Sequence, residues 1–448
     1  MFLDKGFHRS LRFFRIELAV EKEYDPYESI SLTASDLMGN DLHRVKRILV
    51  YTHNSIGLGH AYRTLAVVTG IRKARQDIDF MVLSGSSIPN IFLSQGIEVI
   101  KLPSIRVDLD GREPSMSPRY FQGVDIETLL DLRQHMILDV FDFFRPDVLM
   151  IEHHMVGQAN ELLPLVLKKQ VRRRRASNFA LAYISRGIMK GFTGFQIPLT
   201  NPRHGLVSVN IGSLLDFIYV LEDRTVVDVN KAYMGSDPEL EKKIRYLGKI
   251  TNKTHEELPP RESALHRMGL QDRPIILVSL GRNGQVYSMT RRLFEAFLAQ
   301  DINALYQVAV VLDPYMDRET ARRLRNDPLG KSVRFYPFLP DLVDLIAHSE
   351  LVISRAGYNT INEILMTDVK AIIIPEGHGH GEQEERVKSL SGNHLSLASE
   401  EEFFKADIES TLMQMLRKPS FRKPVRFDKY AIGEKIILDL ERWKRERG

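Results

Sequence analysis

Short apolar runs rich in β-branched residues alternate with amphipathic stretches of helical length along most of this 448-residue chain. The alternation is typical of α/β proteins, in which helices connect the strands of a parallel sheet. It occurs in two series, the first starting at Arg47 and the second after the polar, proline-bearing residues 251–263. Because the chain is too long for one ordinary core, we predict two α/β domains with a cleft between them.

Each series predicts its own strands and helices. The first predicts strands at residues 47–52, 79–85, 97–103, 147–152, 179–185 and 217–222, and helices at 60–75, 88–96 and 125–144. The second predicts strands at residues 274–281, 306–313, 333–338, 351–354 and 370–375, and helices at 290–299 and 359–366. Open α/β sheets bind ligands beyond the carboxyl ends of their strands, so we expect a site in the loops that follow the strands.

The composition excludes several classes of site and partner. The chain has no cysteine, which excludes disulfides, a thiol nucleophile and Cys-ligated metal. No apolar run approaches the roughly 18 residues of a membrane helix, and the net charge of +4 does not indicate a nucleic-acid partner. No export signal is predicted, and we expect a cytoplasmic protein. Residues 1–43 are interpreted as an extension, with a membrane-surface segment as the alternative.

A glycine-rich loop with a histidine follows the first strand. In "HNSIGLGH", Gly57 and Gly59 precede His60 at the start of a helix. The glycines allow a ligand to approach the backbone, and the free N–H groups of a helix start suit an anion. The spacing lacks the third glycine of a dinucleotide fingerprint and the lysine of a P-loop. At this point a plain turn explains these residues equally well.

A similar loop, "SLGRNGQ", follows the first strand of the second series. Its glycines, Gly281 and Gly284, occupy the position that the glycine-rich loop has in the first series. Asn283 and the backbone N–H groups are suited to hold a phosphate, and Arg282 supplies charge. A glycine turn without a ligand is again the alternative.

The most specific segment is "ISRAGYNTINEIL", in which a buried strand ends in small residues and a helix follows. Small residues permit close approach, and a helix N-terminus suits a diphosphate. A carboxylate in the first turns can accept hydrogen bonds from both hydroxyls of a ribose. The candidate binding residues are Ser354, Arg355, Ala356, Gly357, Asn359, Thr360 and Glu363. A capped helix with a surface glutamate is the alternative.

The loop "PEGHGHGEQEER" after the next strand delivers Glu382 and Gln383 just before a helix. Adjacent carboxylate and amide oxygens suit the hydroxyls of a sugar. His378, His380 and Glu382 stand at alternate positions and could instead ligate a metal. No further ligand cluster is evident beside them, so no metal site is predicted.

Together these segments resemble the GT-B glycosyltransferases, specifically the MurG-like branch of family 28, whose two Rossmann-like domains face each other across a cleft. The resemblance runs from about Arg47 to the C-terminus and includes "GLGH", "LSGSSIPNIFLSQGIEVIKLP" and "FLPDLVDLIAHSELVISRAGYNTINEIL". MurG-like enzymes place an arginine and a ribose-binding glutamate eight residues apart, as Arg355 and Glu363 are here. They also place a Gln-Gln or Glu-Gln pair seven and eight residues after a strand-ending proline.

The resemblance implies a division of roles between the domains. The second domain would bind the donor: the turns at residues 281–284 and 354–357 would hold the diphosphate, Glu363 the ribose, and Glu382 with Gln383 and His380 the sugar. The first domain would bind the acceptor beside His60. The residues implied on that side are Gly57, Gly59, Ser86, Ser87 and His153. The implied boundaries are 1–43 for the extension, 44–225 for the acceptor domain, 226–270 for a connection, 271–430 for the donor domain and 431–448 for a helix that crosses back.

Transfer of a sugar to an acceptor requires a base and stabilisation of the departing diphosphate. A histidine at a helix start suits the base role, so we assign it to His60. Glu152, which ends a strand at the same sheet edge beside His153 and His154, is the alternative base or an orienting group. Helix N-termini and arginine stabilise the leaving group without a metal, so we expect no metal and no cofactor besides the nucleotide sugar.

Three functions fit these observations. The first is a hexosyltransferase-type glycosyltransferase that uses a nucleotide-diphosphate sugar, with a UDP-sugar as the expected donor, and a small-molecule, glycan or lipid-linked acceptor. The second is a nucleotide-sugar hydrolase or epimerase with the same donor site. The third is a non-catalytic module that binds an anionic polymer or a membrane surface through the basic run at residues 172–175 and the basic C-terminus. MurG itself has a richer first loop, G-G-x-G-G-H, so its lipid-linked peptidoglycan acceptor is not carried over.

Overall fold

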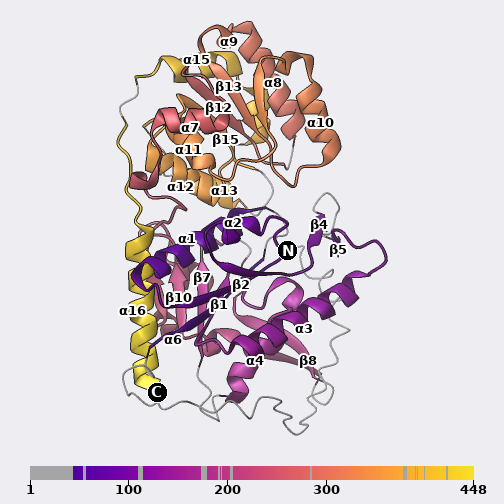
Figure 1. Ribbon diagram of the computed structural model, residues 1–448, viewed down its shortest axis with the longest axis vertical. Helices are drawn as coiled ribbons and strands as arrows, with labels where there is room; N and C mark the ends of the chain where they lie inside the picture. The colour runs from indigo at the N-terminus through magenta and orange to yellow at the C-terminus, as the bar shows by residue number, and fades with distance from the viewer. Residues whose placement is uncertain are drawn as a thin grey trace.

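The computed structural model describes residues 44–53, 57–108, 115–172, 179–189, 192, 194–201, 205–282, 285–376, 381–388, 390, 392–397, 399–419 and 422–447. Within them the chain forms two α/β domains, drawn one above the other in Figure 1, each with its own parallel sheet. The prediction of two Rossmann-like domains is confirmed. The expected extension, residues 1–43, and the basic run at 173–175 lie outside the described residues.

The first domain contains a seven-stranded parallel sheet. In spatial order its strands are β11 (Ile244–Tyr246), β10 (Phe217–Val220), β7 (Ala180–Ser185), β6 (Val148–Glu152), β1 (Arg47–Thr52), β2 (Asp79–Ser84) and β3 (Glu98–Lys101). Alternate residues of β1 enter different cores: Ile48 and Val50 pack on one face, and Leu49 and Tyr51 on the other. Burial on both faces explains why this strand is a continuous apolar run in the sequence.

The second domain contains a six-stranded parallel sheet. Its strands, in spatial order, are β14 (Val333–Tyr336), β13 (Gln307–Val311), β12 (Ile275–Ser279), β15 (Leu351–Ser354), β16 (Lys370–Ile373) and β17 (His394–Ser396). In the register of β12 and β15, Ser279 is paired with Ser354. The two glycine-bearing turns predicted to hold a diphosphate therefore leave the sheet side by side.

Helices cover both faces of each sheet. Those of the first domain are α1 (Gly59–Ala74), α2 (Asn90–Leu93), α3 (Ile126–Phe144), α4 (Leu163–Arg172), α5 (Val229–Tyr233) and α6 (Pro238–Glu241). Those that follow are α7 (Arg261–Met268), α8 (Val286–Ala299), α9 (Ile302–Leu305), α10 (Arg318–Asn326), α11 (Leu342–His348), α12 (Tyr358–Thr367), α13 (Glu382–Val387), α14 (Glu400–Lys405), α15 (Ile408–Arg417) and α16 (Lys429–Arg447).

Several short elements differ from the sequence expectation. Strand β11 lies in residues 226–270, which were expected to be a connection, and it extends the first sheet beyond the expected end at residue 225. Two antiparallel hairpins, β4 (Ile105–Asp108) with β5 (Ser115–Pro118) and β8 (Gln196–Asn201) with β9 (Gly205–Asn210), were not predicted. These elements have three to six residues and lack the continuous apolar run that identifies a buried strand such as β1.

The last helix, α16, returns from the second domain and packs along α1 of the first, at the left of Figure 1. Its apolar side chains join the first core beside α1. The two backbones meet at Gly70 and Gly433, where a Cβ on either residue would overlap the opposite helix. Near its end, Lys444 Nζ donates to Asp147 Oδ1 at 2.7 Å. Two glycines therefore allow the close crossing that ties the end of the chain to the first domain.

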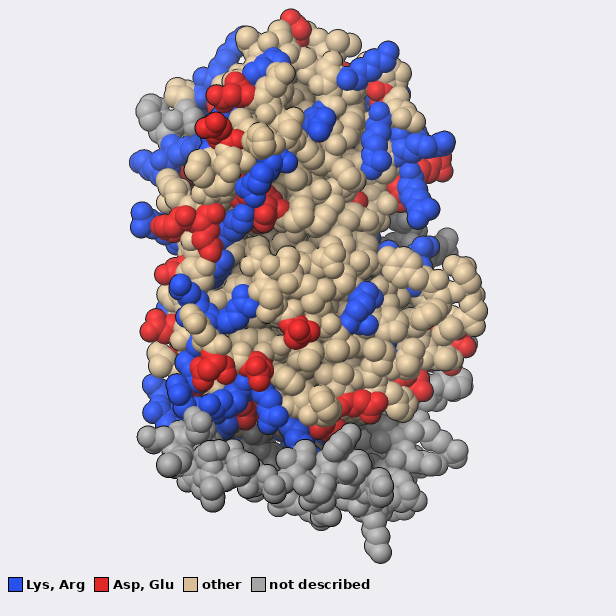
Figure 2. Space-filling view, in the orientation of Figure 1, with Lys and Arg blue, Asp and Glu red and all other residues tan. Residues whose placement is uncertain are grey.

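Charged side chains of both signs are interspersed on the face shown in Figure 2. The exception is a basic group at the lower left, where Figure 1 places the end of α16. The last turn of that helix carries Lys444, Arg445 and Arg447. Among the described residues, no helix has the length and apolar character needed to cross a bilayer.

Candidate functional site

His60 and Glu152 meet at the edge of the first sheet that faces the second domain. His60 lies in the first turn of α1, and Glu152 ends β6 beside Thr52 of β1. The distance between His60 Nδ1 and Glu152 Oε2 is 2.6 Å. Arg63, one turn further along α1, donates from Nε to Glu152 Oε1 at 2.9 Å. Parallel pairing of β1 with β6 thus joins residues that are 92 positions apart in the chain.

The surroundings of Glu152 determine which ring nitrogen of His60 carries the proton. Burial raises the pKa of Glu152, but the charge of Arg63 and the hydrogen bonds from His60 and Arg63 outweigh it and lower that pKa to about 2. Burial also lowers the pKa of His60, and Glu152 opposes this effect. An ionised carboxylate only accepts hydrogen bonds, so the proton of the neutral imidazole lies on Nδ1. His60 Nε2 is therefore left as a proton acceptor.

Three further histidines surround His60. His53 directly follows β1, and its ring centre lies 4.0 Å from that of His60. The ring of His153, after β6, lies 5.1 Å from His60, and that of His154 lies 4.3 Å from His53. His153 and His154 were expected at this site from the sequence, whereas His53 was not. The available signal was that His53 and His153 both follow the ends of neighbouring parallel strands.

The other residues predicted on the acceptor side line the junction between the domains. Gly57 adopts a φ of 155°, a value that side chains rarely permit. The carbonyl oxygen of Gly59 accepts a hydrogen bond from Asn359 Nδ2 of the second domain at 3.0 Å. Ser87 donates its backbone N–H to the hydroxyl of Tyr315, also of the second domain, at 3.1 Å. Ser86 Oγ lies 3.3 Å from the same hydroxyl.

Glu363, the predicted ribose-binding residue, lies on α12 close to the domain junction. Burial, together with the charges of Asp344 and Asp341, raises the pKa of its carboxyl to about 8. Tyr62 of the first domain lies near enough for Glu363 to raise its pKa as well. Without a partner, the ionised form of this carboxyl is therefore disfavoured near neutral pH. A ligand that donates hydrogen bonds to the carboxylate, as ribose hydroxyls do, stabilises that ionised form.

Arg355 and Gln383 support the loops of the second domain. The guanidinium of Arg355 is buried and donates to the carbonyl oxygen of Leu280 at 3.2 Å, and it forms an ion pair with Glu400. Gln383 Oε1 accepts from the backbone N–H groups of Ala356 and Glu376, at 3.1 and 3.0 Å. In this structure both predicted ligand-binding side chains are therefore occupied in bracing the turns.

Glu382 instead reaches across to the first domain. Its carboxylate pairs with Arg186, which follows β7, at 2.6 Å. Arg386, one turn along α13, lies 3.9 Å from the same carboxylate. Arg186 also lowers the pKa of His60. The loop predicted to bind the sugar is thus connected to the histidine cluster through one arginine.

The remaining predicted donor residues lie in or beside the loops that follow β12, β15 and β16 in the chain. Gly281 has a φ of 69°, and Arg282 lies with its guanidinium 5.6 Å from the centre of the Tyr315 ring. Ser354 Oγ donates to the carbonyl oxygen of Arg355 at 3.1 Å. Thr360 lies in the first turn of α12. The predicted residues Asn283, Gly284 and His380 lie outside the described residues, as does His378 of the alternative metal site.

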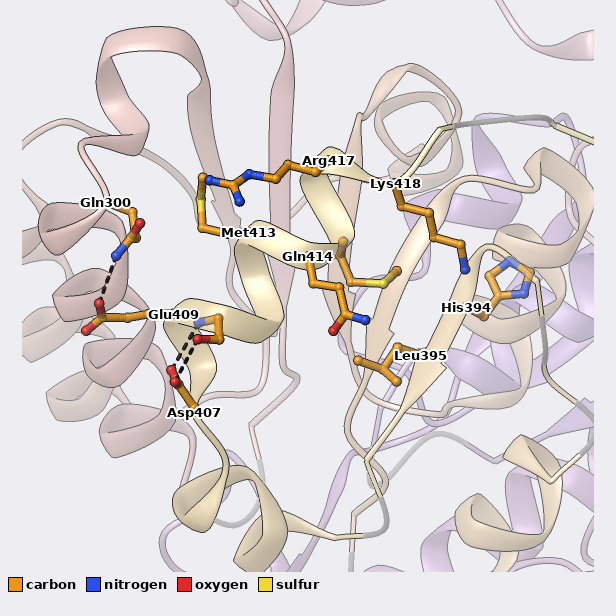
Figure 3. Close-up of a pocket in the computed structure, with 11 residues that line it drawn as sticks. Gln300, His394, Leu395, Asp407, Glu409, Met413, Gln414, Arg417 and Lys418 are labelled. Carbon is orange, nitrogen blue, oxygen red and sulfur yellow. Dashed lines mark hydrogen bonds between the residues drawn. The ribbon is translucent and has the colours of Figure 1, made fainter.

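A cavity of about 900 Å³ lies away from these residues, between the end of α8, strand β17 and helix α15 (Figure 3). None of the residues predicted from the sequence lines it. Its acidic side chains are engaged locally: Gln300 Nε2 donates to Glu409 at 2.9 Å, and Ser410 donates to Asp407. None of the residues that line the cavity belongs to the site at the domain junction.

Most of the second domain matches a known protein family. Residues 283–429 match the family model described as glycosyltransferase family 28 C-terminal domain. Over 253 residues the chain is 24% identical to the UDP-N-acetylglucosamine--N-acetylmuramyl-(pentapeptide) pyrophosphoryl-undecaprenol N-acetylglucosamine transferase of Fusobacterium nucleatum. The alignment covers 53% of this chain and 66% of that protein, so the chain spans just under two thirds of its relative's length.

Solved structures show the same architecture at low sequence identity. UDP-N-acetylglucosamine 2-epimerase from Rickettsia bellii has a TM-score of 0.54 and 14% identity, covering 90% of this chain and 98% of its own. The glycotransferase of kitacinnamycin has a TM-score of 0.50 and 15% identity, covering 90% and 96%. At these identities the likeness shows the fold alone. The chain therefore has the GT-B fold, and its residues 283–429 match the glycosyltransferase family 28 C-terminal domain.

Proposed function

We propose that the chain is a glycosyltransferase that moves a sugar from a nucleotide-diphosphate donor, a UDP-sugar, to a hydroxyl or amine group of an acceptor. The observation that carries this proposal is the pairing of His60 Nδ1 with Glu152 at 2.6 Å, on the sheet edge that faces the family 28 domain. The pair holds a neutral imidazole with Nε2 available, which is what deprotonation of an acceptor needs.

In the proposed reaction, the acceptor oxygen or nitrogen attacks the anomeric carbon of the donor sugar. His60 Nε2 takes the acceptor proton, and Glu152 stabilises the imidazolium that forms. The bond between the anomeric carbon and the diphosphate breaks, and the diphosphate leaves with the electron pair. Backbone N–H groups of the turns after β12 and β15, at the starts of α8 and α12, stabilise its charge.

The donor would lie along the second domain with its ribose on Glu363. The relative from Fusobacterium nucleatum is named for transfer of N-acetylglucosamine from its UDP form to an undecaprenol-linked acceptor. We carry over the class of donor only. The loop that would face the acceptor, residues 57–60, has fewer glycines than MurG has, so the acceptor of this chain is a separate question.

A thermal-shift screen of nucleoside diphosphates and nucleotide sugars tests the donor site. We expect a uridine nucleotide to raise the melting temperature of the wild-type chain and to have little effect on Glu363→Ala. Lys388 is exposed and directly follows α13. Lys388→Ala is therefore the matched control and should respond as the wild type does. The assignment fails if no nucleotide stabilises the wild type, or if Glu363→Ala responds equally.

The same protein should then be incubated with the stabilising nucleotide sugar without an acceptor. A transferase releases nucleoside diphosphate slowly until an acceptor is added. Rapid loss of the nucleotide sugar without acceptor would instead identify the hydrolase or epimerase that shares this donor site. Salt-sensitive binding to anionic polymer or lipid, without any nucleotide effect, would favour the binding module.

A further inference from the structure

Tyr315 of the second domain is anchored in both domains. It lies in the loop after β13, and its backbone N–H donates to Asp313 Oδ1 at 2.7 Å. Its hydroxyl accepts the backbone N–H of Ser87 at 3.1 Å and lies 3.3 Å from Ser86 Oγ, in the loop after β2 of the first domain. Ser87 Oγ in turn accepts from the hydroxyl of Tyr120 at 2.9 Å. These contacts hold the ring of Tyr315 at a fixed place in the junction between the domains.

Two guanidinium groups, one from each domain, lie against this ring. Arg119 directly follows β5, in the hairpin at the right of Figure 1, and its Cζ atom lies 4.9 Å from the centre of the Tyr315 ring. Arg282, in the turn after β12, has its Cζ atom 5.6 Å from the same centre. The face of an aromatic ring attracts a guanidinium, which explains why each arginine lies there. The ring does not cancel the repulsion between the two positive charges.

Among the described residues, positive charge predominates around this ring. Burial lowers the pKa of Arg119, and the charge of Arg282 acts in the same direction. Burial and the charges of Arg133 and Arg119 likewise lower the pKa of Lys101 to about 8. Asp313 interacts with both Arg119 and Arg282, but burial raises its pKa and so weakens it as a counter-charge. An anion placed between the two arginines would therefore be stabilised.

The turn that carries Arg282 offers a hydrogen-bond donor and room for a ligand. The Nε atom of Arg282 is buried and has no hydrogen-bond partner among the described residues. A buried donor without an acceptor costs free energy, which suggests that a ligand accepts from it. The preceding residue, Gly281, has a φ of 69°, and a Cβ there would meet no atom of the described chain within 4 Å. The turn therefore has open space beside it.

We propose that Arg119 and Arg282, held on the ring of Tyr315, bind a phosphate or diphosphate group between the two domains. A phosphate group has enough oxygens to accept from two guanidiniums at once, whereas one bidentate arginine already satisfies a carboxylate. In the proposed reaction, this group is either the diphosphate of the donor or a phosphate carried by the acceptor. The link to a substrate rests on the proposed function, whereas the anion site itself does not.

Anion binding tests the site without an assay of turnover. The full chain is titrated by calorimetry with UDP and with inorganic diphosphate, in buffer without divalent ions. We expect Arg119→Gln to bind at least one of these anions at least about 10-fold more weakly than the wild type, because a charge-assisted hydrogen bond is lost. Arg106→Gln is the matched control and should bind nearly as the wild type does. Arg106 is exposed on the same hairpin and its charge acts on Arg119, so this variant reports the general effect of removing a positive charge.

Two comparisons identify the substrate that brings the phosphate. If it is the donor, Arg119→Gln binds UDP more weakly but binds uridine as the wild type does. If it is the acceptor, Arg119→Gln binds UDP normally, and the loss appears when inorganic diphosphate is titrated into protein saturated with UDP. Either loss supports the anion site.

The proposal is overturned if UDP and inorganic diphosphate, the latter with and without saturating UDP, bind to Arg119→Gln as tightly as to Arg106→Gln. It is equally overturned if the wild type binds neither anion. Tyr315→Leu removes the ring that holds both arginines and should show the same loss, so the test remains valid if Arg119→Gln fails to fold. Melting curves establish that each variant is folded.

The same titrations separate this proposal from the proposed function. Diphosphate binding that depends on Arg119, with UDP bound no more tightly than diphosphate, would leave the anion site in place and remove the nucleotide site. UDP binding that depends on Glu363, with no effect of Arg119→Gln on either anion, would leave the nucleotide site in place and remove the anion site.

Discussion

The two sides of the domain junction present different kinds of groups. On the first domain the polar groups are side chains, and His60 Nδ1 lies 2.6 Å from Glu152 Oε2. On the second domain, Arg355 and Gln383 are turned inward and brace the loops, through the carbonyl oxygen of Leu280 and the backbone N–H of Ala356. In the proposed function, the first side serves proton transfer and the second holds a nucleotide diphosphate in place.

The largest expected effect comes from the carboxylate that orients His60. Glu152→Gln should lower turnover by roughly 10²–10⁴-fold, because His60 loses the group that fixes its proton and stabilises its charged form. It should also lower the free energy of unfolding by about 3–5 kcal/mol, since Arg63 is left buried without its counter-charge.

A second buried pair of the first domain provides the control for Glu152. Glu161 pairs with Arg133 at 2.6 Å, and neither side chain is more than 1% exposed. Glu161→Gln should cost a similar free energy of unfolding while turnover per folded molecule stays near that of the wild type. Equal loss of turnover in the two variants would contradict a special role for Glu152.

The pH dependence of nucleotide-sugar affinity tests the other side of the comparison. Without ligand, Glu363 holds its proton up to about pH 8, whereas the unfolded chain releases it near 4.5. This group therefore reduces stability as the pH rises between those values. Ribose hydroxyls favour the ionised form, so binding releases a proton. Affinity should rise by up to about tenfold per pH unit below pH 8 and level off above it.

Calorimetry of a UDP-sugar in two buffers with different ionisation enthalpies measures the released proton. A nucleotide sugar is the suitable probe because its phosphates do not titrate in this range. Glu363→Gln should bind more weakly at pH 8 and lose the pH dependence. An affinity that falls toward pH 8, or the same slope in the Gln variant, would show that Glu363 does not meet the ligand.

A smaller effect is expected from the amide that braces the second domain. Gln383→Ala leaves the N–H groups of Ala356 and Glu376 without their acceptor, which should cost about 1–3 kcal/mol of stability. Nucleotide affinity should fall with it, because the turn after β15 loses its support. Denaturant melts and calorimetry measure both quantities, with Lys388→Ala as the control. Unchanged stability would mean that the turns do not depend on this side chain.

The smallest effect is expected from the ion pair that joins the two sides. A double-mutant cycle with Arg186→Ala and Glu382→Ala should give a coupling energy of about 0.5–1 kcal/mol in stability, because both groups keep some exposure to solvent. Bound nucleotide sugar should change this coupling if the sugar reaches Glu382. A coupling energy of zero with and without ligand would show that this ion pair does not connect the two domains energetically.

The predictability of this chain differs between its fold and its site. Long buried strands such as β1 were located to the residue, because both faces of a parallel strand are apolar. The three-residue β11 and β17 leave no period to detect. In the site, the glycine-rich loop before α1 indicated His60. The carboxylate in the first turns of α12 indicated Glu363.

What the sequence could not supply was strand register and side-chain direction. His53 comes next to His60 and His153 only because β1 and β6 pair in parallel with Thr52 opposite Glu152. Likewise, Arg355 occupies its expected place in the motif, yet its guanidinium bonds to Leu280 within the second domain. A motif identifies the residue, whereas packing around it decides which way the side chain points.

The most direct test of the central claim uses one variant and two measurements. His60→Ala should bind a UDP-sugar with the affinity of the wild type, since the proposed nucleotide site lies on the second domain. Its turnover should fall by roughly 10²–10⁴-fold and recover in part when imidazole is added. Near-normal turnover without imidazole, or a loss of nucleotide binding equal to the loss of turnover, would contradict the division of roles between the two domains.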